Sequence, residues 1–199
     1  MSGEPFKCGY GAIVNEDVEV LEWCLRQLVR PNDDVSILEI GTHDGGTAMG
    51  MMRFLESIGG AIDYYGIDPD NGSHRPRHLP GGARMIIGDS AEVYDQVPYD
   101  HDLVWVDGCH CFNHVVLDTM HYAPKVRMGG FICYHDINPV GQGEKEHQYH
   151  GPLTADFGLA VRAALKALRP WFVDNGFIQV AEKYPTDIPN CGTIAYQRR

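Results

Sequence analysis

Four side chains that can move protons or bind a metal ion follow two short apolar runs of the sequence. Asp107 and His110 come just after one run, and His135 and Asp136 come directly after the next. Imidazoles titrate near neutral pH, and carboxylates with imidazoles also bind divalent cations. The pattern predicts catalytic roles for Asp107, His110 and His135, and a cation site formed by Asp107, His135 and Asp136. A metal-free site with a histidine base, or a packing role for His135, stays open.

Polar residues also follow three earlier apolar runs. Glu39 and Gly41 lie at the end of the first, Asp68 at the end of the second, and Asp89–Ser90 after the third. In an open α/β sheet, ligands bind outside the carboxyl ends of the strands. Polar groups at five successive ends therefore predict one ligand site along one edge of a sheet.

The elements that must position these groups can be read from hydrophobic periodicity. Helices are predicted where apolar residues recur on one face, at 15–30, 47–57, 112–123 and 157–168. Strands are predicted at short runs rich in branched residues, at 35–40, 62–67, 84–87, 103–106, 130–134, 177–180 and 193–196. Alternating helices and apolar strands imply a parallel sheet covered on both faces. The expected fold is α/β, Rossmann-like and doubly wound, with a mostly parallel seven-stranded sheet and helices on both faces.

The length of 199 residues fits one domain, residues 1–199, with an N-terminal helical segment at 1–31. Residues 137–151 are polar and rich in Gly and His, which predicts a loop that acts as a lid or a substrate wall.

A formal net charge of -11 argues against nucleic acid and anionic membranes as partners. The sequence contains neither a secretory signal nor an apolar stretch of the roughly 20 residues that a membrane span needs. We therefore expect a cytoplasmic protein that acts on a small-molecule acceptor.

A glycine-rich turn after the first strand predicts a bound nucleoside. The spacing is Glu39-x-Gly41-x-x-x-Gly45-x-Thr47, which differs from the G-x-G-x-x-G of dinucleotide-binding proteins. Glycine lets the backbone come close to a ligand, and His43 is expected to shape the pocket. Asp68 lies 23 residues after Gly45, where an acid accepts both hydroxyls of a ribose.

These residues resemble the first motif of the class I S-adenosylmethionine (SAM)-dependent methyltransferases, E-x-G-x-x-x-G-x-[ST]. The resemblance covers roughly residues 35–136 and implies SAM as the cofactor. It also implies a set of cofactor-binding residues, namely Glu39, Gly41, Thr42, His43, Gly45, Thr47, Asp68, Asp89, Ser90 and Asp107.

The segment Val104–Asp118 resembles a narrower group, which carries V-D-G-x-H-x-[YF]-x-x-V-x-x-D followed by a Gly-Gly strand that ends in His-Asp. Gly129–Gly130 and His135–Asp136 complete the match. This group includes macrocin-type sugar and antibiotic O-methyltransferases and cephalosporin hydroxylase-like proteins. The resemblance implies O-methylation of a small-molecule hydroxyl, assisted by a divalent cation (Mg, Mn or Fe) between Asp107 and Asp136. Where relatives often have two adjacent acids, this chain has His135–Asp136, which leaves the metal open.

Two other functions remain as alternatives: a metal-dependent hydroxylase-like oxidoreductase on the same scaffold, and a non-catalytic SAM-fold binding protein. A homodimer is expected by analogy with the scaffold alone.

Two further expectations concern the segment after the fourth strand. Asp118 lies on the following helix, where we expect a solvated or intrahelical role. Cys109, Cys111 and His114 suggest zinc, but their spacing matches none of the usual structural pairs, and ligands so close in sequence rarely converge on one ion. We therefore predict no zinc site there.

Overall fold

The computed structural model describes residues 15–31, 33–69, 79–138, 146–147, 151–152, 157–185 and 191–199. Its helices are α1 (Asn15–Leu28), α2 (Gly46–Ser57), α3 (Ser90–Val93), α4 (Phe112–Tyr122) and α5 (Phe157–Asp174), with 3-10 turns at Tyr94–Gln96 and Ala123–Lys125. Its strands are β1 (Asp34–Ile40), β2 (Ala61–Asp68), β3 (Arg84–Ile87), β4 (His101–Val106), β5 (Val126–Tyr134), β6 (Glu146–His147), β7 (Gly151–Pro152), β8 (Phe177–Lys183) and β9 (Thr193–Arg198).

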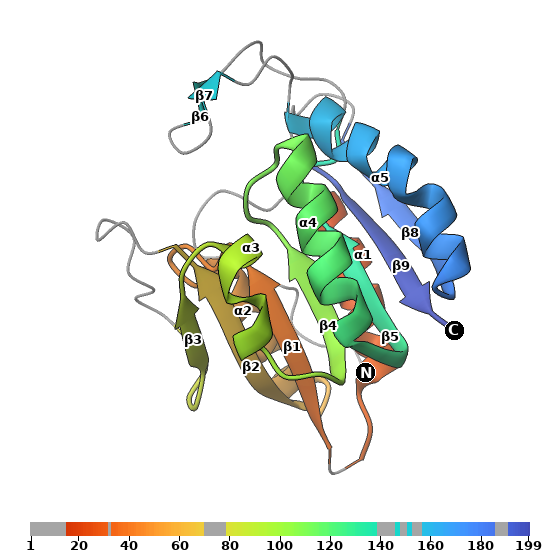
Figure 1. Ribbon diagram of the computed structural model, residues 1–199. Helices are drawn as coiled ribbons and strands as arrows, with labels where there is room; N and C mark the ends of the chain where they lie inside the picture. Colours follow the sequence, from red (N-terminus) through yellow and green to blue (C-terminus); the bar gives the residue numbers. More distant parts are fainter. Residues whose placement is uncertain are drawn as a thin grey trace.

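Seven of the strands form one sheet in the order β3-β2-β1-β4-β5-β9-β8 (Figure 1). The first five run parallel, whereas β9 runs antiparallel to both of its neighbours, β5 and β8. The sheet is therefore mostly parallel, as predicted, but it is mixed and not purely parallel, because β9 runs against its neighbours. The reason is the short connection between β8 and β9: residues 184–192 are fewer than the dozen or so that a parallel crossover needs.

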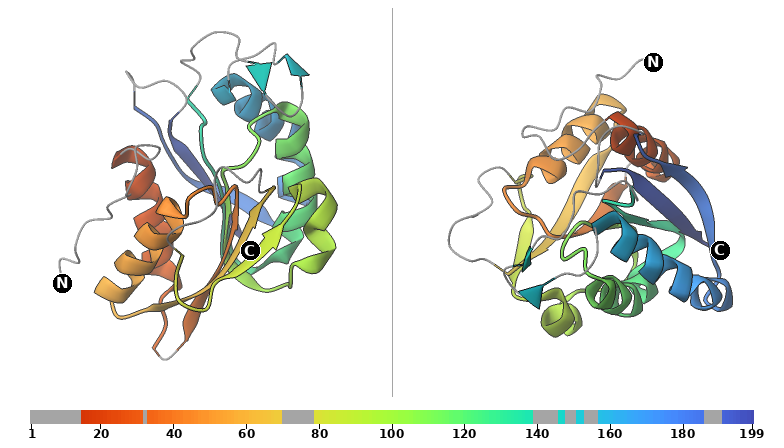
Figure 2. Two further views of the ribbon diagram at one scale, coloured as in Figure 1. Left: turned by 90° about the vertical axis from the view of Figure 1, so that its left-hand side faces the viewer. Right: turned by 90° about the horizontal axis from the view of Figure 1, so that it is seen from above.

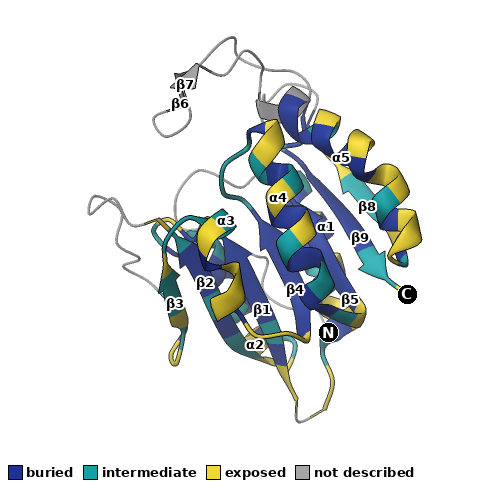
Figure 3. Ribbon diagram, in the orientation of Figure 1, coloured by how far each residue is buried: buried dark blue, intermediate teal, exposed yellow. Residues whose placement is uncertain are grey.

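Helices cover both faces of this sheet, with α1 and α2 on one face and α3, α4 and α5 on the other (Figure 2). Each face has its own apolar core, because side chains alternate along a strand. In β4, Leu103 and Trp105 belong to the core beneath α1 and α2, while Val104 and Val106 belong to the core beneath α4 and α5. The central strands are consequently buried along most of their length (Figure 3).

The same alternation sets the direction in which two of the predicted catalytic side chains point. Trp105 of β4 and Cys133 of β5 pack on the face that α1 covers. Asp107 and His135 each lie two positions further along, so they continue toward that face beyond the strand ends. Helix α1 therefore limits the space available to both side chains.

The predicted elements are found at their expected places, with ends that differ by a few residues. The N-terminal helical segment is present as α1, and residues 1–14 lie outside the described residues. Of the predicted lid loop at 137–151, most lies outside the described residues; within it, β6 and β7 pair as antiparallel strands. Its role as a lid stays a prediction.

Among the helices of the described ranges, none combines the length and the apolar character that crossing a membrane requires.

Gly41 packs closely against the backbone of Asp107, the residue that follows β4. Its φ is +87°, and a Cβ atom there would lie 2.2 Å from the backbone oxygen of Asp107. We predict that Gly41→Ala destabilises the fold by about 1–2 kcal/mol through strain and about 1–3 kcal/mol more through the clash. Gly59→Ala is the matched control, because Gly59 has φ +83° with open space around it. Denaturant unfolding of both variants measures the difference, and equal losses would contradict the close approach.

Candidate functional site

The residues that follow β1, β4 and β5 are held side by side by backbone hydrogen bonds. The N–H groups of Gly41, Asp107 and His135 donate to carbonyls at the end of a neighbouring strand, at 2.8, 2.9 and 3.0 Å. The register of the sheet thus continues one residue beyond the strands. This brings the glycine-rich turn to the same edge as Asp107, His110, His135 and Asp136, as the sequence predicts. We call these four residues the acid–histidine group.

His135 lies between two carboxylates. Its Nδ1 is 2.9 Å from Oδ1 of Asp107, and its Nε2 is 3.0 Å from Oδ2 of Asp17. Only the imidazolium form can donate from both nitrogens. Burial opposes the charge, but attraction to Asp107 and the hydrogen bonds from His135 to Asp107 and Asp17 outweigh burial and raise the pKa of His135 well above its ordinary value.

Asp17 is the one member of this group that the sequence analysis missed. It lies in α1, is fully buried, and also accepts a hydrogen bond from Thr193 Oγ1 of β9 at 2.8 Å. A signal was present in the sequence, because Asp17 precedes Leu21 by four positions and Cys24 by seven and so shares the apolar face of the helix. An acid on such a face needs a buried partner.

His110 lies on the other side of Asp107. Its Nε2 is 3.3 Å from Oδ1 of Asp107 and 3.5 Å from Oδ2 of Asp136. Burial opposes protonation, but the charge of Asp136 and the contact with Asp107 raise the pKa of His110. Burial likewise opposes ionisation of Asp107, yet His135 and His110 hold the pKa of Asp107 below its ordinary value.

Asp136 has a backbone conformation that is uncommon for a residue other than glycine, with φ at +55°. Strain of this kind concentrates at functional sites. Burial raises the pKa of Asp136, against the attraction of the two histidines. Asp136 is therefore the more basic of the two strand-end carboxylates.

The structure brings all four predicted chemical residues together. One ligand atom each from Asp107, His110, His135 and Asp136 lies within 4.8 Å of the others. Two carboxylates and an imidazole suit a hard or borderline divalent cation. Both nitrogens of His135 face carboxylates, so the atoms that best fit a cation belong to Asp107, His110 and Asp136. The predicted set of Asp107, His135 and Asp136 stays a prediction.

The glycine-rich turn lies against the end of β2, to which its N–H groups donate hydrogen bonds. The N–H of His43 donates to Oδ2 of Asp68 at 2.8 Å, and His43 has a positive φ of 48°. Gly45 has a φ of 85° and caps α2, whose first turn holds Thr47. His43 thus contacts Asp68 directly, while the N–H groups of Gly41 and Thr42 donate to the carbonyl of the preceding residue, Ile67. Contact of the turn with a ligand stays a prediction.

Glu39 lies beneath this turn and is 1% exposed. It accepts a hydrogen bond from the hydroxyl of Tyr64, which also lies 3.2 Å from the hydroxyl of Thr42. Burial raises the pKa of Glu39 well above its ordinary value. The described contacts of Glu39 and Thr42 support the turn from within, and direct contact with a cofactor stays a prediction.

Asp89 and Ser90 begin the short helix α3. Oδ1 of Asp89 accepts the N–H of Ala91 at 2.9 Å, and the hydroxyl of Ser90 donates to Oδ1 of Asp118 at 2.6 Å. Asp118 is fully buried, and burial raises its pKa to about 7. The expectation of a solvated or intrahelical Asp118 is wrong, because packing of α4 against α3 closes solvent off from it.

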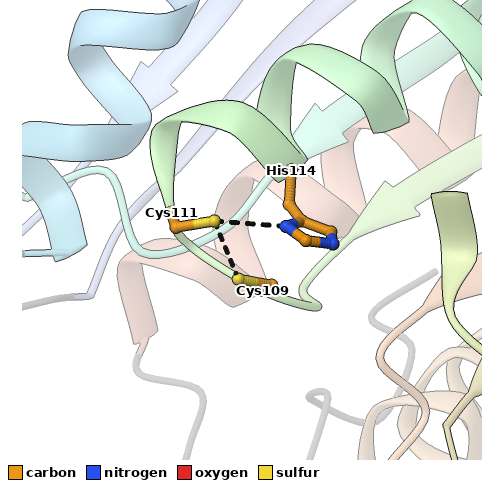
Figure 4. A group of neighbouring side chains, drawn as sticks. All are labelled: Cys109, Cys111 and His114. Carbon is orange, nitrogen blue, oxygen red and sulfur yellow. Dashed lines mark hydrogen bonds between the residues drawn. The ribbon is translucent and has the colours of Figure 1, made fainter. Parts of the chain in front are cut away.

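Cys109, Cys111 and His114 converge at the start of α4 (Figure 4). The two sulfur atoms are 3.1 Å apart, and Sγ of Cys111 is 3.2 Å from Nδ1 of His114. Hydrogen bonding from Cys109, aided by His114, lowers the pKa of Cys111 to about 4. The sequence argument that such closely spaced ligands do not converge is wrong here, because the chain turns at Gly108 and then enters the helix.

Residues 38–137, about half of the chain, match the family described as methyltransferase domain. No curated protein sequence matches the chain. Among solved structures, the MycE methyltransferase from the mycinamycin biosynthetic pathway, in complex with Mg, SAH and mycinamycin VI, is 24% identical with a TM-score of 0.52. The match covers 84% of this chain but only 46% of MycE, so the chain spans less than half the length of that protein.

Two further structures share the fold over more of their own length. The O-methyltransferase NovP is 15% identical, with a TM-score of 0.61 over 90% of this chain and 78% of NovP. Cofactor-bound Rv0187 from MTB is 14% identical, with a TM-score of 0.64 over 97% of this chain and 84% of Rv0187. The chain belongs to the methyltransferase-domain family and has the fold of the class I SAM-dependent methyltransferases.

Proposed function

We propose that this protein is a SAM-dependent O-methyltransferase that acts on a hydroxyl group of a small molecule. The observation that carries the proposal is the contact between the glycine-rich turn and the acid–histidine group. Gly41 lies so close to the backbone of Asp107 that no side chain fits between them. A methyl donor held by the turn would therefore present its methyl group beside Asp107, His110 and Asp136.

The chemistry of methyl transfer fits what these residues can do. The sulfonium of SAM carries an activated methyl group, so the enzyme must align the acceptor oxygen and remove its proton. Asp68 is proposed to accept the ribose hydroxyls, and Asp89 and Ser90 to flank the adenine. The name of NovP and the presence of SAH and mycinamycin VI with MycE support an oxygen acceptor of small-molecule type.

The two histidines receive different roles. Both nitrogens of His135 face Asp107 or Asp17, so we assign it as a positioning residue that holds Asp107 ionised. His110 faces Asp107 and Asp136 through Nε2 and is the proposed proton acceptor. Its raised pKa implies that proton acceptance improves as pH rises through that value.

A divalent cation fits the same position. Asp107, His110 and Asp136 would hold it. Its positive charge would then replace that of protonated His110 in balancing the two carboxylates. Such an ion lowers the pKa of a bound hydroxyl and orients it. The Mg present with MycE supports this part of the proposal, with Mg, Mn or Fe as the candidates here.

Asp68 tests the cofactor assignment. Asp68→Asn should weaken SAM binding at least tenfold, because charge-assisted hydrogen bonds of about 1.5–3 kcal/mol become neutral ones. Asp63→Asn is the matched control, since Asp63 lies on the same strand and pairs instead with Arg84. Calorimetry with SAM, SAH and NAD measures the affinities. Equal affinity in both variants, or preference for NAD, would refute the assignment.

Asp107 tests the catalytic assignment. Asp107→Asn should lower SAH formation at least ~100-fold across a panel of hydroxylated small molecules that the wild type methylates. SAM affinity should change little, because the proposed role of Asp107 is to orient the acceptor. Asp174→Asn, at the exposed end of α5, is the control and should retain turnover.

A chelator separates the two forms of this mechanism. If a cation acts, excess chelator removes turnover and Mg²⁺, Mn²⁺ or Fe²⁺ restores it. Full turnover with chelator, and no metal by elemental analysis, would remove the cation and leave His110 as the base. Full turnover of Asp107→Asn would reject the site itself.

Histidine titration tests the charge assignment of His135. Ring ¹⁵N resonances should show His101 titrating near pH 4, His121 below the ordinary value, and His135 well above it. Protonated His135 contributes its full stabilisation of the fold below about pH 6.5, the pKa of histidine in the unfolded chain. This contribution is lost as pH rises through the raised pKa that His135 has in the folded protein. Asp17→Asn should lower the pKa of His135 and leave His101 unchanged; a neutral His135 at pH 6 would contradict the assignment.

A further inference from the structure

We propose that Cys109, Cys111 and His114 form a second metal site, which takes a thiophilic divalent cation of the zinc class. The site lies in the loop between β4 and α4 and in the first turn of α4 (Figure 4). It is separate from the acid–histidine group described above, and nothing in its geometry depends on methyl transfer.

The spacing of the three ligand atoms carries this proposal. Cys111 caps α4 and His114 lies three positions on, so both side chains share one face of its first turn. A tetrahedral zinc ion with bonds of about 2.3 Å to sulfur and 2.0 Å to nitrogen sets its ligands about 3.5–3.8 Å apart. The observed separations are 3.1 Å between the sulfurs and 3.2 Å between Cys111 and His114. Movements of about half an ångström therefore admit an ion.

A partner on the far side of the imidazole is a second, independent observation. Nδ1 of His114 faces the sulfur of Cys111, while its Nε2 lies 3.5 Å from Oδ1 of Asp89. Metal-binding histidines almost always direct the other ring nitrogen to a carboxylate or carbonyl, which fixes the ring and strengthens the ligand. His114 already has this arrangement.

The donor atoms distinguish the ion from the one proposed near Asp107. Two sulfurs and one nitrogen select soft or borderline ions such as Zn²⁺, whereas a site rich in carboxylates accepts harder ions. His110 lies between the two cysteines in sequence, yet its side chain joins the other group. The loop thus directs the sulfurs of Cys109 and Cys111 to one site and the imidazole of His110 to the other. One short segment supplies ligands to two sites of different chemistry.

The consequence of binding is a fixed loop. Three protein ligands leave one coordination position for solvent, and Cys109 is partly exposed, which gives an ion a way in. An ion at this position would tie the loop that carries Asp107 and His110 to the first turn of α4. Metal binding should therefore stabilise the folded protein, since the unfolded chain has no preformed site.

Cobalt titration of the full chain, stripped of metal and kept reduced, tests the proposal. We expect one equivalent of Co²⁺ to give thiolate-to-cobalt charge-transfer absorption, which Zn²⁺ displaces. Cys111→Ser should remove this absorption and weaken Zn²⁺ binding at least tenfold. Cys191→Ser, which removes a partly exposed thiol outside the cluster, and Asp136→Asn, which alters the other group, should both retain it.

Thermal unfolding keeps the test decisive if one variant folds poorly. Zn²⁺ should raise the midpoint of the wild type and of Cys191→Ser more than that of Cys109→Ser or Cys111→Ala, because any binding at the acid–histidine group is common to all four proteins. Three results would overturn the proposal: absence of the charge-transfer band in the wild type, its persistence in folded Cys111→Ser, or a Cys109–Cys111 disulfide that survives reductant.

Discussion

A buried imidazolium held between two carboxylates is the interaction on which the rest of this site depends. His135 follows β5, Asp107 follows β4 and Asp17 lies in α1, so one ring connects two strands to the helix that covers them. A buried charge is tolerated only when it is paired and hydrogen-bonded, and removing one partner leaves the others uncompensated. Thr193 extends the connection to β9 through Asp17, which ties the antiparallel part of the sheet to the same point.

This constraint explains why the glycine-rich turn and the acid–histidine group lie side by side. The His135 contact fixes Asp107, and the backbone of Asp107 in turn leaves room only for a glycine at position 41. Beyond Asp107, His110 and Asp136 complete an arrangement in which imidazoles separate acids that would otherwise repel one another. Donor and acceptor would thus meet without any movement of the sheet.

The sequence predicts this architecture well where local pattern decides it. Apolar runs identify the seven strands of the sheet, and the polar residues at their carboxyl ends identify the edge where the glycine-rich turn and the acid–histidine group lie. Three features depend on tertiary contacts instead and could not be read in this way. Asp17 becomes a partner of His135 only when α1 docks, Asp118 is buried only because α4 packs beside Ser90, and the cysteine–histidine cluster needs the turn at Gly108. The direction of β9 follows from a connection too short for a crossover.

The central claim is that a methyl donor on the glycine-rich turn lies directly beside the acid–histidine group. A crystal structure of the protein with bound SAH tests this most directly. The account predicts that the ribose hydroxyls contact Asp68 and that the sulfur of SAH faces Asp107, His110 and Asp136 across the position of the acceptor. Binding of SAH elsewhere, or with its sulfur directed away from these residues, would contradict it.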